Sequence, residues 1–181
     1  MSIETARLRL QPFAPEHLLA LLEGVRPFNE QSGLRATEGL RDFFVSDEVS
    51  PAWHAQLRAS RKPDAWVHGF AVIDRAGGEV IGTAAFKGPP DDEGRVEIAY
   101  GIVPGYQGRG YATEVTAELL AFAFGSGRVS LVRAHTLPVS NASARVLTKS
   151  GFRCIGEVVD PEDGLVWRWE RTREPAEMHP A

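Results

Sequence analysis

Residues 96–123 read VEIAYGIVPGYQGRGYATEVTAELLAFA and hold the three features that decide the fold. The first eight residues are rich in β-branched and aromatic side chains, and alternate members form an apolar face, which predicts a strand over residues 96–103. A proline and a glycine then end the strand, and two further glycines keep the next backbone free of bulky side chains. A helical pattern begins at about Tyr111. The stretch therefore predicts a strand, a glycine loop and a helix.

This order of elements predicts an anion-binding site at the start of the helix. The first amides of a helix lack partners within the helix and lie at the positive end of its dipole, so the N–H groups of residues 108–113 are expected to cradle a pyrophosphate. Two common phosphate motifs are excluded. Tyr111 and Ala112 stand where a Walker loop needs Lys and Ser or Thr, and the loop lacks the third glycine of a dinucleotide fingerprint.

The loop residues Gln107-Gly108-Arg109-Gly110-Tyr111-Ala112 resemble the cofactor loop of the GCN5-related N-acetyltransferases, which reads Q/R-x-x-G-x-G/A between the central strand and the next helix. The resemblance implies that acetyl-CoA is the acetyl donor, with its pyrophosphate on the loop and its thioester at the open end of the strand. The cofactor-binding residues that it implies are Ile102, Val103, Gln107, Gly108, Arg109, Gly110, Tyr111, Ala112 and Thr113. The alternative is an ordinary strand-to-helix turn that needs glycine.

Composition limits the other possibilities. With 181 residues, 43% of them hydrophobic and 24% charged, the chain is expected to form one globular domain. A net charge of −4 argues against broad binding to nucleic acid. Cys154 is the only cysteine and the histidines lack metal spacing, so neither an intramolecular disulfide nor a metal site is expected. No apolar signal segment or membrane span is apparent, which predicts a cytoplasmic protein that does not bind membranes.

The remaining elements follow from local patterns. We expect residues 27–35 to form a loop, and residues 172–181 to form a flexible polar tail beyond a core at 5–171. The other expected strands are 5–11, 65–74, 79–87, 129–136, 152–159 and 165–171, and the other expected helices are 15–23, 37–44, 50–59 and 141–150. The fold class is α/β (α+β): a mixed central sheet of about seven strands flanked by about four to five helices, in the order β-α-α-β-β-β-α-β-α-β-β. The strands on either side of the glycine-loop helix are expected to be parallel neighbours.

The same order of elements matches the acetyltransferase fold, so the resemblance extends over residues 5–171. The segment NASARVL at 141–147 resembles the second cofactor segment of the family and implies that Asn141 faces the coenzyme A arm. In the related branch this Asn often lies one residue earlier, where this chain has Ser140, and the equal alternative is that Asn141 serves only as a helix cap. The segments TARLRLQPF and VEIAYGIVPGYQGRGYATE resemble the branch that acetylates ribosomal-protein amino termini (the ribosomal-protein-alanine type).

The family transfers the acetyl group directly to an amine, so a base must first take a proton from the ammonium. Glu97 is the first candidate, because it shares a strand face with the small residues Ala99 and Gly101, and a Glu here often has that role in the related branch. The alternative is a structural Glu97 paired with Arg95 or another cation. His135, near the end of the strand at 129–136, is the second candidate base, or a structural hydrogen-bonding residue.

For other reactive side chains, the sequence gives weaker indications of a role in the reaction. Tyr100 and Tyr111 are possible acids for the leaving thiolate, but packing in the core is the simpler interpretation of both. Cys154 has no neighbouring His and is interpreted as a small core residue rather than a nucleophile. Trp53 and His54 are expected to contact the acceptor, because they lie in the region that varies most in this family.

The leading hypothesis is an N-acetyltransferase that acts on the amino terminus of a protein or peptide. A small-molecule amine, such as an aminoglycoside or a polyamine, is the alternative acceptor, and the acidic residues Asp91, Asp92 and Glu93 would suit a cation. A non-catalytic domain that senses acyl-CoA is the alternative outside enzymes. The C-terminal hairpin makes a homodimer plausible, since its exposed edge is able to pair across a two-fold axis.

Overall fold

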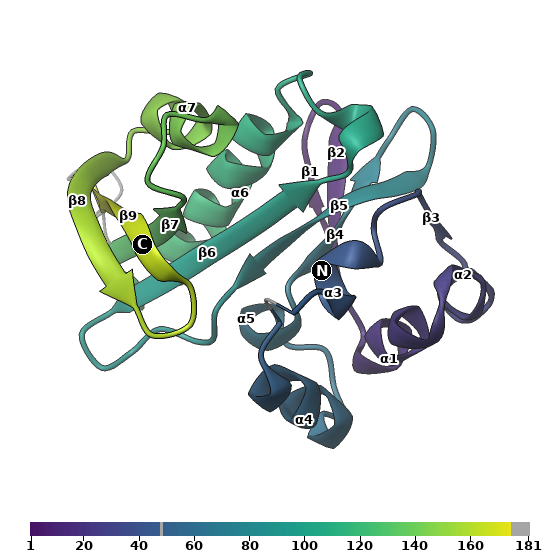
Figure 1. The fold of residues 1–181 in the computed structure, drawn as a ribbon. Coiled ribbons are helices and arrows are strands. Elements are labelled where there is room, and N and C mark those ends of the chain that lie inside the picture. The colour runs from purple at the N-terminus through teal and green to yellow at the C-terminus, as the bar shows by residue number, and fades with distance from the viewer. Residues whose placement is uncertain (48, 175–181) are drawn as a thin grey trace. The chain divides into compact units, whose positions relative to one another are not determined.

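The computed structural model describes residues 1–47 and 49–174 (Figure 1). The chain divides into two compact units, the first made of Met1–Ala85 with Tyr100–Ala112 and the second of Phe86–Ala99 with the chain from Thr113 onward. Strand β6 (Arg95–Ile102) and helix α6 (Tyr111–Gly125) each run from one unit into the other. In the part of the chain that is described, no helix is both long and apolar enough to cross a membrane.

The first unit holds the sheet order β1-β2-β4-β5-β6, and β3 pairs with β5. Its remaining strands are β1 (Ile3–Glu4), β2 (Leu8–Pro12), β3 (Arg35–Ala36), β4 (Phe70–Asp74) and β5 (Glu79–Phe86, whose last residue belongs to the second unit). Its helices are α1 (Pro15–Glu23), α2 (Val25–Ser32), α3 (Asp42–Val45), α4 (Pro51–Ala59), α5 (Ala65–His68) and the 3-10 turn η1 (Pro104–Tyr106). β2, β4 and β5 pair antiparallel.

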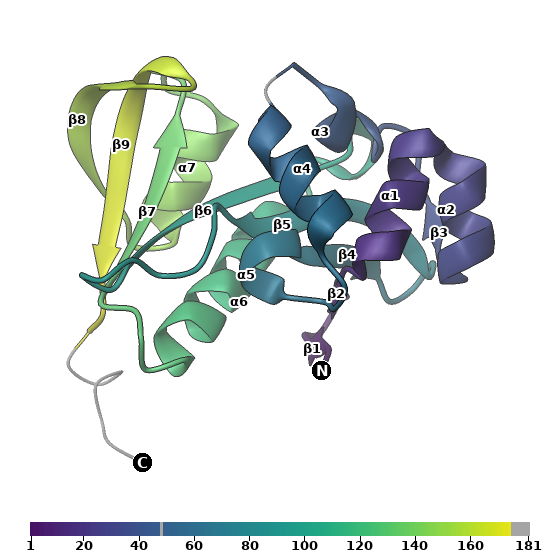
Figure 2. The same ribbon diagram turned by 90° about the horizontal axis from the view of Figure 1, so that it is seen from below.

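Aromatic rings join the helices to the sheet in this unit. Phe13, just after β2, meets Phe28 of α2 at 6.5 Å between ring centroids and Phe44 of α3 at 5.7 Å. Trp53 of α4 stacks on Phe44 at 6.0 Å. α1 and α2 lie side by side (Figure 2), and α1 has the predicted bounds with Gly24 directly after its end.

Four predictions for this unit were wrong in detail, three of them at a strand or loop. The strand predicted at 5–11 is β2, which begins at Leu8 rather than Thr5, because Thr5 Oγ1 accepts the Leu8 N–H at 2.9 Å and makes the turn between β1 and β2. The predicted loop at 27–35 contains most of α2, a polar helix whose one buried side chain is Phe28. The predicted strand at 65–74 opens with the helical turn α5, which is capped by Asp64 and ended by Gly69 at φ 69°.

The segment after β3 is also less helical than expected. Thr37 donates both its N–H and its hydroxyl to the Val80 carbonyl of β5, which holds the chain out of a helix until α3 begins at Asp42. The helix predicted at 50–59 is confirmed as α4, with Ser50 as its cap accepting the Trp53 N–H. The local sequence pattern therefore predicted α4 correctly but placed the start of α3 too early.

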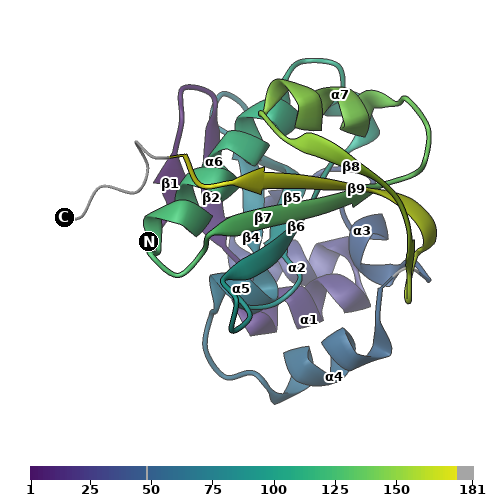
Figure 3. The same ribbon diagram turned by 90° about the vertical axis from the view of Figure 1, so that its left-hand side faces the viewer.

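The second unit holds the sheet order β6-β7-β9-β8, visible edge to edge in Figure 3. Its elements are β7 (Leu131–Thr136), α7 (Ala142–Lys149), β8 (Arg153–Asp160) and β9 (Gly164–Thr172). β6 and β7 pair parallel, which confirms the predicted crossover through α6, and β9 pairs antiparallel with both β7 and β8. Of the predicted tail at 172–181, Thr172 ends β9, and residues 175–181 lie outside the described residues.

The described residues thus form nine strands and seven α-helices, in a mixed sheet with flanking helices. The extra strands are the two-residue β1 and β3, and the extra helices are short or polar segments of the first unit. In the second unit, Val115 and Leu119 on one stripe of α6 are fully buried, and the Phe86 and Phe122 rings lie 5.6 Å apart.

Candidate active site

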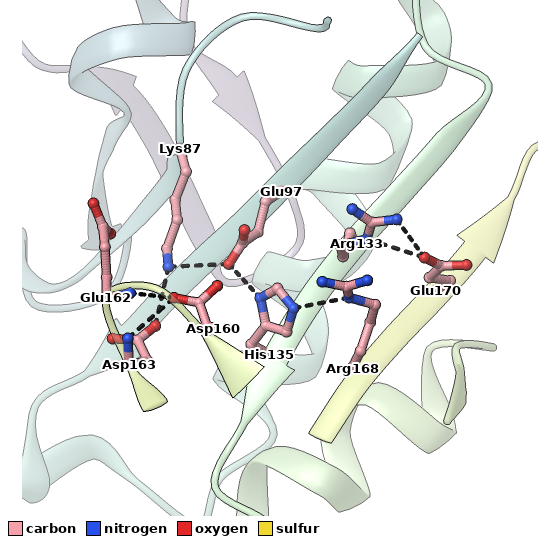
Figure 4. Close-up of polar contacts among 9 residues, drawn as sticks. All are labelled: Lys87, Glu97, Arg133, His135, Asp160, Glu162, Asp163, Arg168 and Glu170. Atoms are coloured by element: carbon pink, nitrogen blue, oxygen red, sulfur yellow. Dashed lines mark hydrogen bonds and ion pairs between the residues drawn. The ribbon is translucent and has the colours of Figure 1, made fainter. Parts of the chain in front are cut away.

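Glu97 and His135, the two candidate bases, touch each other in the second unit (Figure 4). Glu97 lies on β6 opposite Arg133 of the parallel strand β7, and His135 follows two residues later on the same face of β7. His135 Nδ1 lies 2.8 Å from Glu97 Oε1. The His135 side chain is 5% exposed and that of Glu97 is 20% exposed, so the carboxylate is the more accessible member of the pair.

Arg168 determines which ring nitrogen of His135 carries the proton. It lies directly opposite His135 on β9, and its Nε donates to His135 Nε2 at 3.1 Å. A guanidinium has no acceptor, so Nε2 must be the unprotonated nitrogen. Nδ1 therefore carries the hydrogen and donates it to Glu97 Oε1. His135 is therefore the neutral Nδ1–H tautomer, and its ring is held by Glu97 at Nδ1 and by Arg168 at Nε2.

Lys87 supplies the positive charge beside Glu97. Its Nζ lies 3.0 Å from Glu97 Oε1 and 3.3 Å from Asp163 Oδ2 in the turn between β8 and β9. Burial alone would lower the pKa of Lys87, but the two carboxylates outweigh it and raise that pKa, so Lys87 is an ammonium at neutral pH. Asp160 fixes this turn by accepting the N–H groups of Glu162 and Asp163.

Glu97 therefore has one oxygen held and one oxygen available. Both of its hydrogen-bonding contacts fall on Oε1, and among residues 1–47 and 49–174 no hydrogen bond reaches Oε2. The cation pairing that was considered from the sequence, with Arg95 or another cation, is formed with Lys87 and not with Arg95. Arg95 instead contacts Asp91 at 2.9 Å and Glu93 at 2.8 Å. The arrangement leaves a carboxylate that is able to take a proton on Oε2.

A second ion pair braces the same strands. Arg133 donates from Nε and Nη2 to Glu170 Oε1 at 3.0 and 2.6 Å, between neighbouring positions of β7 and β9. Both side chains are about a quarter exposed or less, with 24% for Arg133 and 20% for Glu170. Among the described residues, neither side chain has a hydrogen bond or ion pair with His135, so the pair serves the strand pairing next to the Glu97 site (Figure 4).

The glycine loop lies in the first unit, between η1 and the start of α6. Gly108 and Gly110 have φ values of 75° and 81°, the left-handed region that favours glycine. Gln107 Nε2 donates to the Ile102 carbonyl at 2.9 Å and ties the loop back to the end of β6. The loop is thus shaped by two glycines and held by the one side chain that the cofactor motif requires.

Arg7 is a contact of this loop that the sequence did not suggest. It lies in the turn between β1 and β2, and its Nη1 donates to the Arg109 carbonyl at 2.8 Å. Its guanidinium carbon lies 4.4 Å from the centre of the Tyr111 ring. The sequence placed Arg7 only within the strand expected at 5–11. No local sequence pattern predicts a contact between Arg7 and Arg109, because they lie far apart in the chain.

The other proposed cofactor residues have clear structural environments. The side chains of Ile102 and Val103 are buried, and the Val103 N–H donates to the Ile81 carbonyl of β5. Ala112 and Thr113 lie in the first turn of α6. Asn141 Oδ1 accepts the Ala144 N–H at 2.9 Å, so Asn141 caps α7 as one of the two interpretations proposed. Its contact with coenzyme A stays a prediction.

Four other residues were candidates for a role in the reaction or in acceptor binding, and each has a defined environment. Tyr111 is buried, and its hydroxyl lies 3.4 Å from Asp74 Oδ1. Trp53 Nε1 donates to the Val67 carbonyl, and His54 Nε2 lies 3.3 Å from the Phe44 carbonyl. Cys154 is exposed, so its interpretation as a core residue was wrong: it lies on β8, the last strand in the sheet order.

Metal binding finds no support in these side chains. In residues 1–47 and 49–174, no three or more His, Cys, Asp or Glu residues gather in a group able to hold an ion. The absence of a metal stays a prediction for the chain.

Comparison with known proteins agrees with this geometry. An acetyltransferase (GNAT) domain matches residues 7–153. An uncharacterized N-acetyltransferase, p20, of Bacillus licheniformis is 30% identical over 93 residues, which are 51% of this chain and 52% of that protein. The chain thus spans about half the length of the curated relatives that it matches.

Solved structures show the same fold over nearly the whole chain. The ribosomal-protein-S5-alanine acetyltransferase of Vibrio fischeri has a TM-score of 0.65 and 16% identity, covering 97% of this chain and 98% of that one. A GNAT-family acetyltransferase of Bacillus anthracis has a TM-score of 0.60 and 20% identity, covering 95% and 98%. The domain match extends over most of the sequence, and the chain therefore belongs to the acetyltransferase (GNAT) family.

Proposed function

We propose that this chain is an acetyl-CoA-dependent N-acetyltransferase that acts on a primary amine. GNAT acetyltransferases use acetyl-CoA, which supplies the acetyl group as a thioester. The observation that carries the proposal is the glycine loop. Gly108 and Gly110 have left-handed φ values, and Gln107 ties the loop to the end of β6 immediately before the start of α6. Backbone N–H groups point out of this end of a helix. That backbone suits a pyrophosphate.

Glu97 is the base in this proposal. An amine with a pKa of ~8 to ~10 is mostly protonated at neutral pH and must lose a proton before its lone pair is able to bond to the acetyl carbon. Glu97 Oε2 is able to take that proton, directly or through water. His135 is a positioning residue, because its Nε2 lone pair is occupied by Arg168 and its Nδ1 already bears a hydrogen. No residue is assigned as the acid for the leaving thiolate.

The acceptor in this proposal is the amino terminus of a protein or peptide. The support is the likeness of residues 5–13 and 96–114 to the branch that acetylates ribosomal proteins. The acidic loop gives less support to a cationic small molecule than its sequence suggested, because Arg95 pairs with both Asp91 and Glu93. Hydrogen bonds from the backbone and side chain of Arg95 lower the pKa of Asp91, so this carboxylate is charged but already partnered.

The test measures release of the coenzyme A thiol from acetyl-CoA with three sets of acceptors: amino-terminal peptides, polyamines and aminoglycosides. We expect turnover with peptides. The Glu97→Gln variant should lose about 100-fold or more in kcat, with coenzyme A affinity unchanged, because it removes only the base. Glu157→Gln, a change of the same kind at an exposed position of β8, is the matched control. An unchanged kcat and pH profile in Glu97→Gln would show that the base is elsewhere.

The other outcomes separate the alternatives. Turnover only with polyamines or aminoglycosides would replace the acceptor and keep the reaction. Tight binding of acetyl-CoA without turnover on any amine would support a non-catalytic acyl-CoA sensor. If neither coenzyme A nor acetyl-CoA binds, the assignment of the loop is wrong.

Three further features belong to the proposal. The domain match runs through both units, which supports one acetyltransferase domain.

A homodimer would use β8, which is last in its strand order and exposes 53% of Ile155 and 79% of Val159. Sedimentation of the purified chain at several concentrations tests the dimer. The cytoplasmic location stays a prediction from the sequence.

A further inference from the structure

We propose that Arg7 is a positioning residue for coenzyme A: it turns the peptide between Arg109 and Gly110 so that the Gly110 N–H is presented to the pyrophosphate. This inference rests on the proposed function of the glycine loop. It concerns a residue about a hundred positions earlier in the chain, outside the loop motif. All the contacts that carry it lie within the first unit.

The first step is the orientation of one peptide unit. Arg7 Nη1 donates to the Arg109 carbonyl at 2.8 Å. The peptide is planar and trans, as no cis bond occurs among the described residues, so the Arg109 C=O and the Gly110 N–H point in opposite directions. Holding the carbonyl on Arg7 therefore directs the Gly110 N–H away from Arg7. Without this contact, the freedom of Gly110 in φ would allow the peptide to rotate.

The second step is the position of the guanidinium itself. It lies over the Tyr111 ring, with its central carbon 4.4 Å from the ring centre. The Tyr111 hydroxyl lies 3.4 Å from Asp74 Oδ1 at the end of β4, and the other oxygen of Asp74 accepts the Gly77 N–H at 2.9 Å. The start of α6 and the guanidinium are thus fixed to the same sheet.

The third step is the space around Gly110. A Cβ added there would lie 3.5 Å from Arg7 Nη2, an ordinary contact distance. Arg7 therefore packs directly against the backbone of the loop, and its positive charge lies next to the amides proposed to hold an anion. A lysine would keep the charge, but it has no planar group to lie flat on Tyr111 while bonding the carbonyl.

The experiment measures coenzyme A binding by titration calorimetry and follows the Gly110 amide by NMR. In the unaltered protein, saturating coenzyme A should shift the Gly110 amide resonance. Arg7→Ala should weaken coenzyme A binding about tenfold, the effect of one lost charge-assisted hydrogen bond, and should reduce the Gly110 shift at saturation. Arg26→Ala, which removes an exposed arginine paired with Glu30 on α2, should bind like the unaltered protein.

The outcomes are distinguishable. If the unaltered protein binds no coenzyme A, the proposed function fails. If it binds and Arg7→Ala binds equally with the same Gly110 shift, Arg7 has no positioning role and the inference is wrong. If Arg7→Ala does not fold, Arg7→Lys decides: weaker binding with a reduced Gly110 shift supports the inference, and binding equal to the unaltered protein overturns it.

Discussion

Arg168 Nε donates to His135 Nε2 at 3.1 Å, from the position directly opposite on the antiparallel strand β9. This contact distinguishes the roles of the two candidate bases, Glu97 and His135. A His that already receives a hydrogen bond on its one lone pair and donates its N–H to Glu97 is arranged to orient the carboxylate. The same pairing explains why His135 can be nearly fully buried without an unpaired ring nitrogen.

The tautomer of His135 is directly measurable. We expect nitrogen NMR of the unaltered protein at neutral pH to show a neutral ring with the hydrogen on Nδ1, because Arg168 is able only to donate. In Arg168→Met the Nε2 atom loses its donor, but Glu97 Oε1 still accepts from Nδ1, so the hydrogen should stay on Nδ1 and only the Nε2 resonance should shift. Arg133→Met is the matched control, since Arg133 binds Glu170 rather than His135. A ring with the hydrogen on Nε2 in the unaltered protein would contradict the assigned network.

The sequence predicted part of this site. The two-residue period of strands placed Glu97 on the face with small residues, and the crossover through α6 made β6 and β7 parallel neighbours, as the structure confirms. Lys87 and Arg168 were not predicted. Each reaches the site from another strand or its end, and such pairings depend on register between strands, which a single sequence does not specify.

The same limit applies to the fold. α1 and α6 were located well, because proline or glycine marks their ends and apolar residues repeat along them. α2 was missed because Phe28 is its single buried residue, so packing on α1 rather than its own pattern makes it a helix. α5 is one turn, set by the Asp64 cap and Gly69, within an apparently strand-like run.

The glycine loop allows a matched pair of substitutions. Gly108 has φ 75°, and a Cβ there would meet no atom within 4 Å, so the cost of Gly108→Ala is purely conformational, about 1 kcal/mol. We expect Gly108→Ala to weaken coenzyme A binding several-fold in titration calorimetry. Gly105→Ala, also in open space but without a left-handed φ, should bind normally. Equal affinities for the two variants would show that loop conformation does not limit binding.

His68 should make stability depend on pH. Burial lowers its pKa from the usual 6.5, outweighing the charges of Asp64 and Glu16, which raise it. Its Nδ1 accepts the Asp64 N–H at 3.0 Å, and its Nε2 lies 3.0 Å from Ser60 Oγ, so the folded chain holds a neutral ring. Below pH 6.5 the unfolded chain binds a proton that the folded chain does not. Stability is therefore full above this pH and is lost as pH falls toward the folded pKa.

Urea unfolding between pH 7.5 and pH 5 checks this dependence. The free energy of unfolding should fall by at most about 1.4 kcal/mol per pH unit from this one group. His68→Gln should reduce the slope, since glutamine does not titrate. His17→Gln, at a residue of α1 that is only partly buried, is the control. A slope unchanged in His68→Gln would assign the pH dependence to other groups.

Gly82 has no room for a side chain, because a Cβ there would lie 2.2 Å from the Gly101 carbonyl oxygen. Both residues belong to the first unit, where β5 and the end of β6 approach through their backbones. Backbone atoms in paired strands are unable to swing aside as a flexible side chain would, so Gly82→Ala must push the strands apart. We expect a loss of about 2 to 4 kcal/mol in the free energy of unfolding.

Gly125→Ala is the control for that substitution. Gly125 ends α6, has no left-handed φ, and a Cβ there would meet no atom within 4 Å, so alanine should be neutral or slightly stabilising. Chemical unfolding of the two variants gives the comparison. The carbonyl of Gly101 lies two residues from Ala99 and four from Glu97 on the same strand. Displacing it should therefore also lower kcat in Gly82→Ala protein that remains folded. A folded Gly82→Ala variant with normal stability and kcat would mean that β5 and β6 are able to move apart at this point without cost.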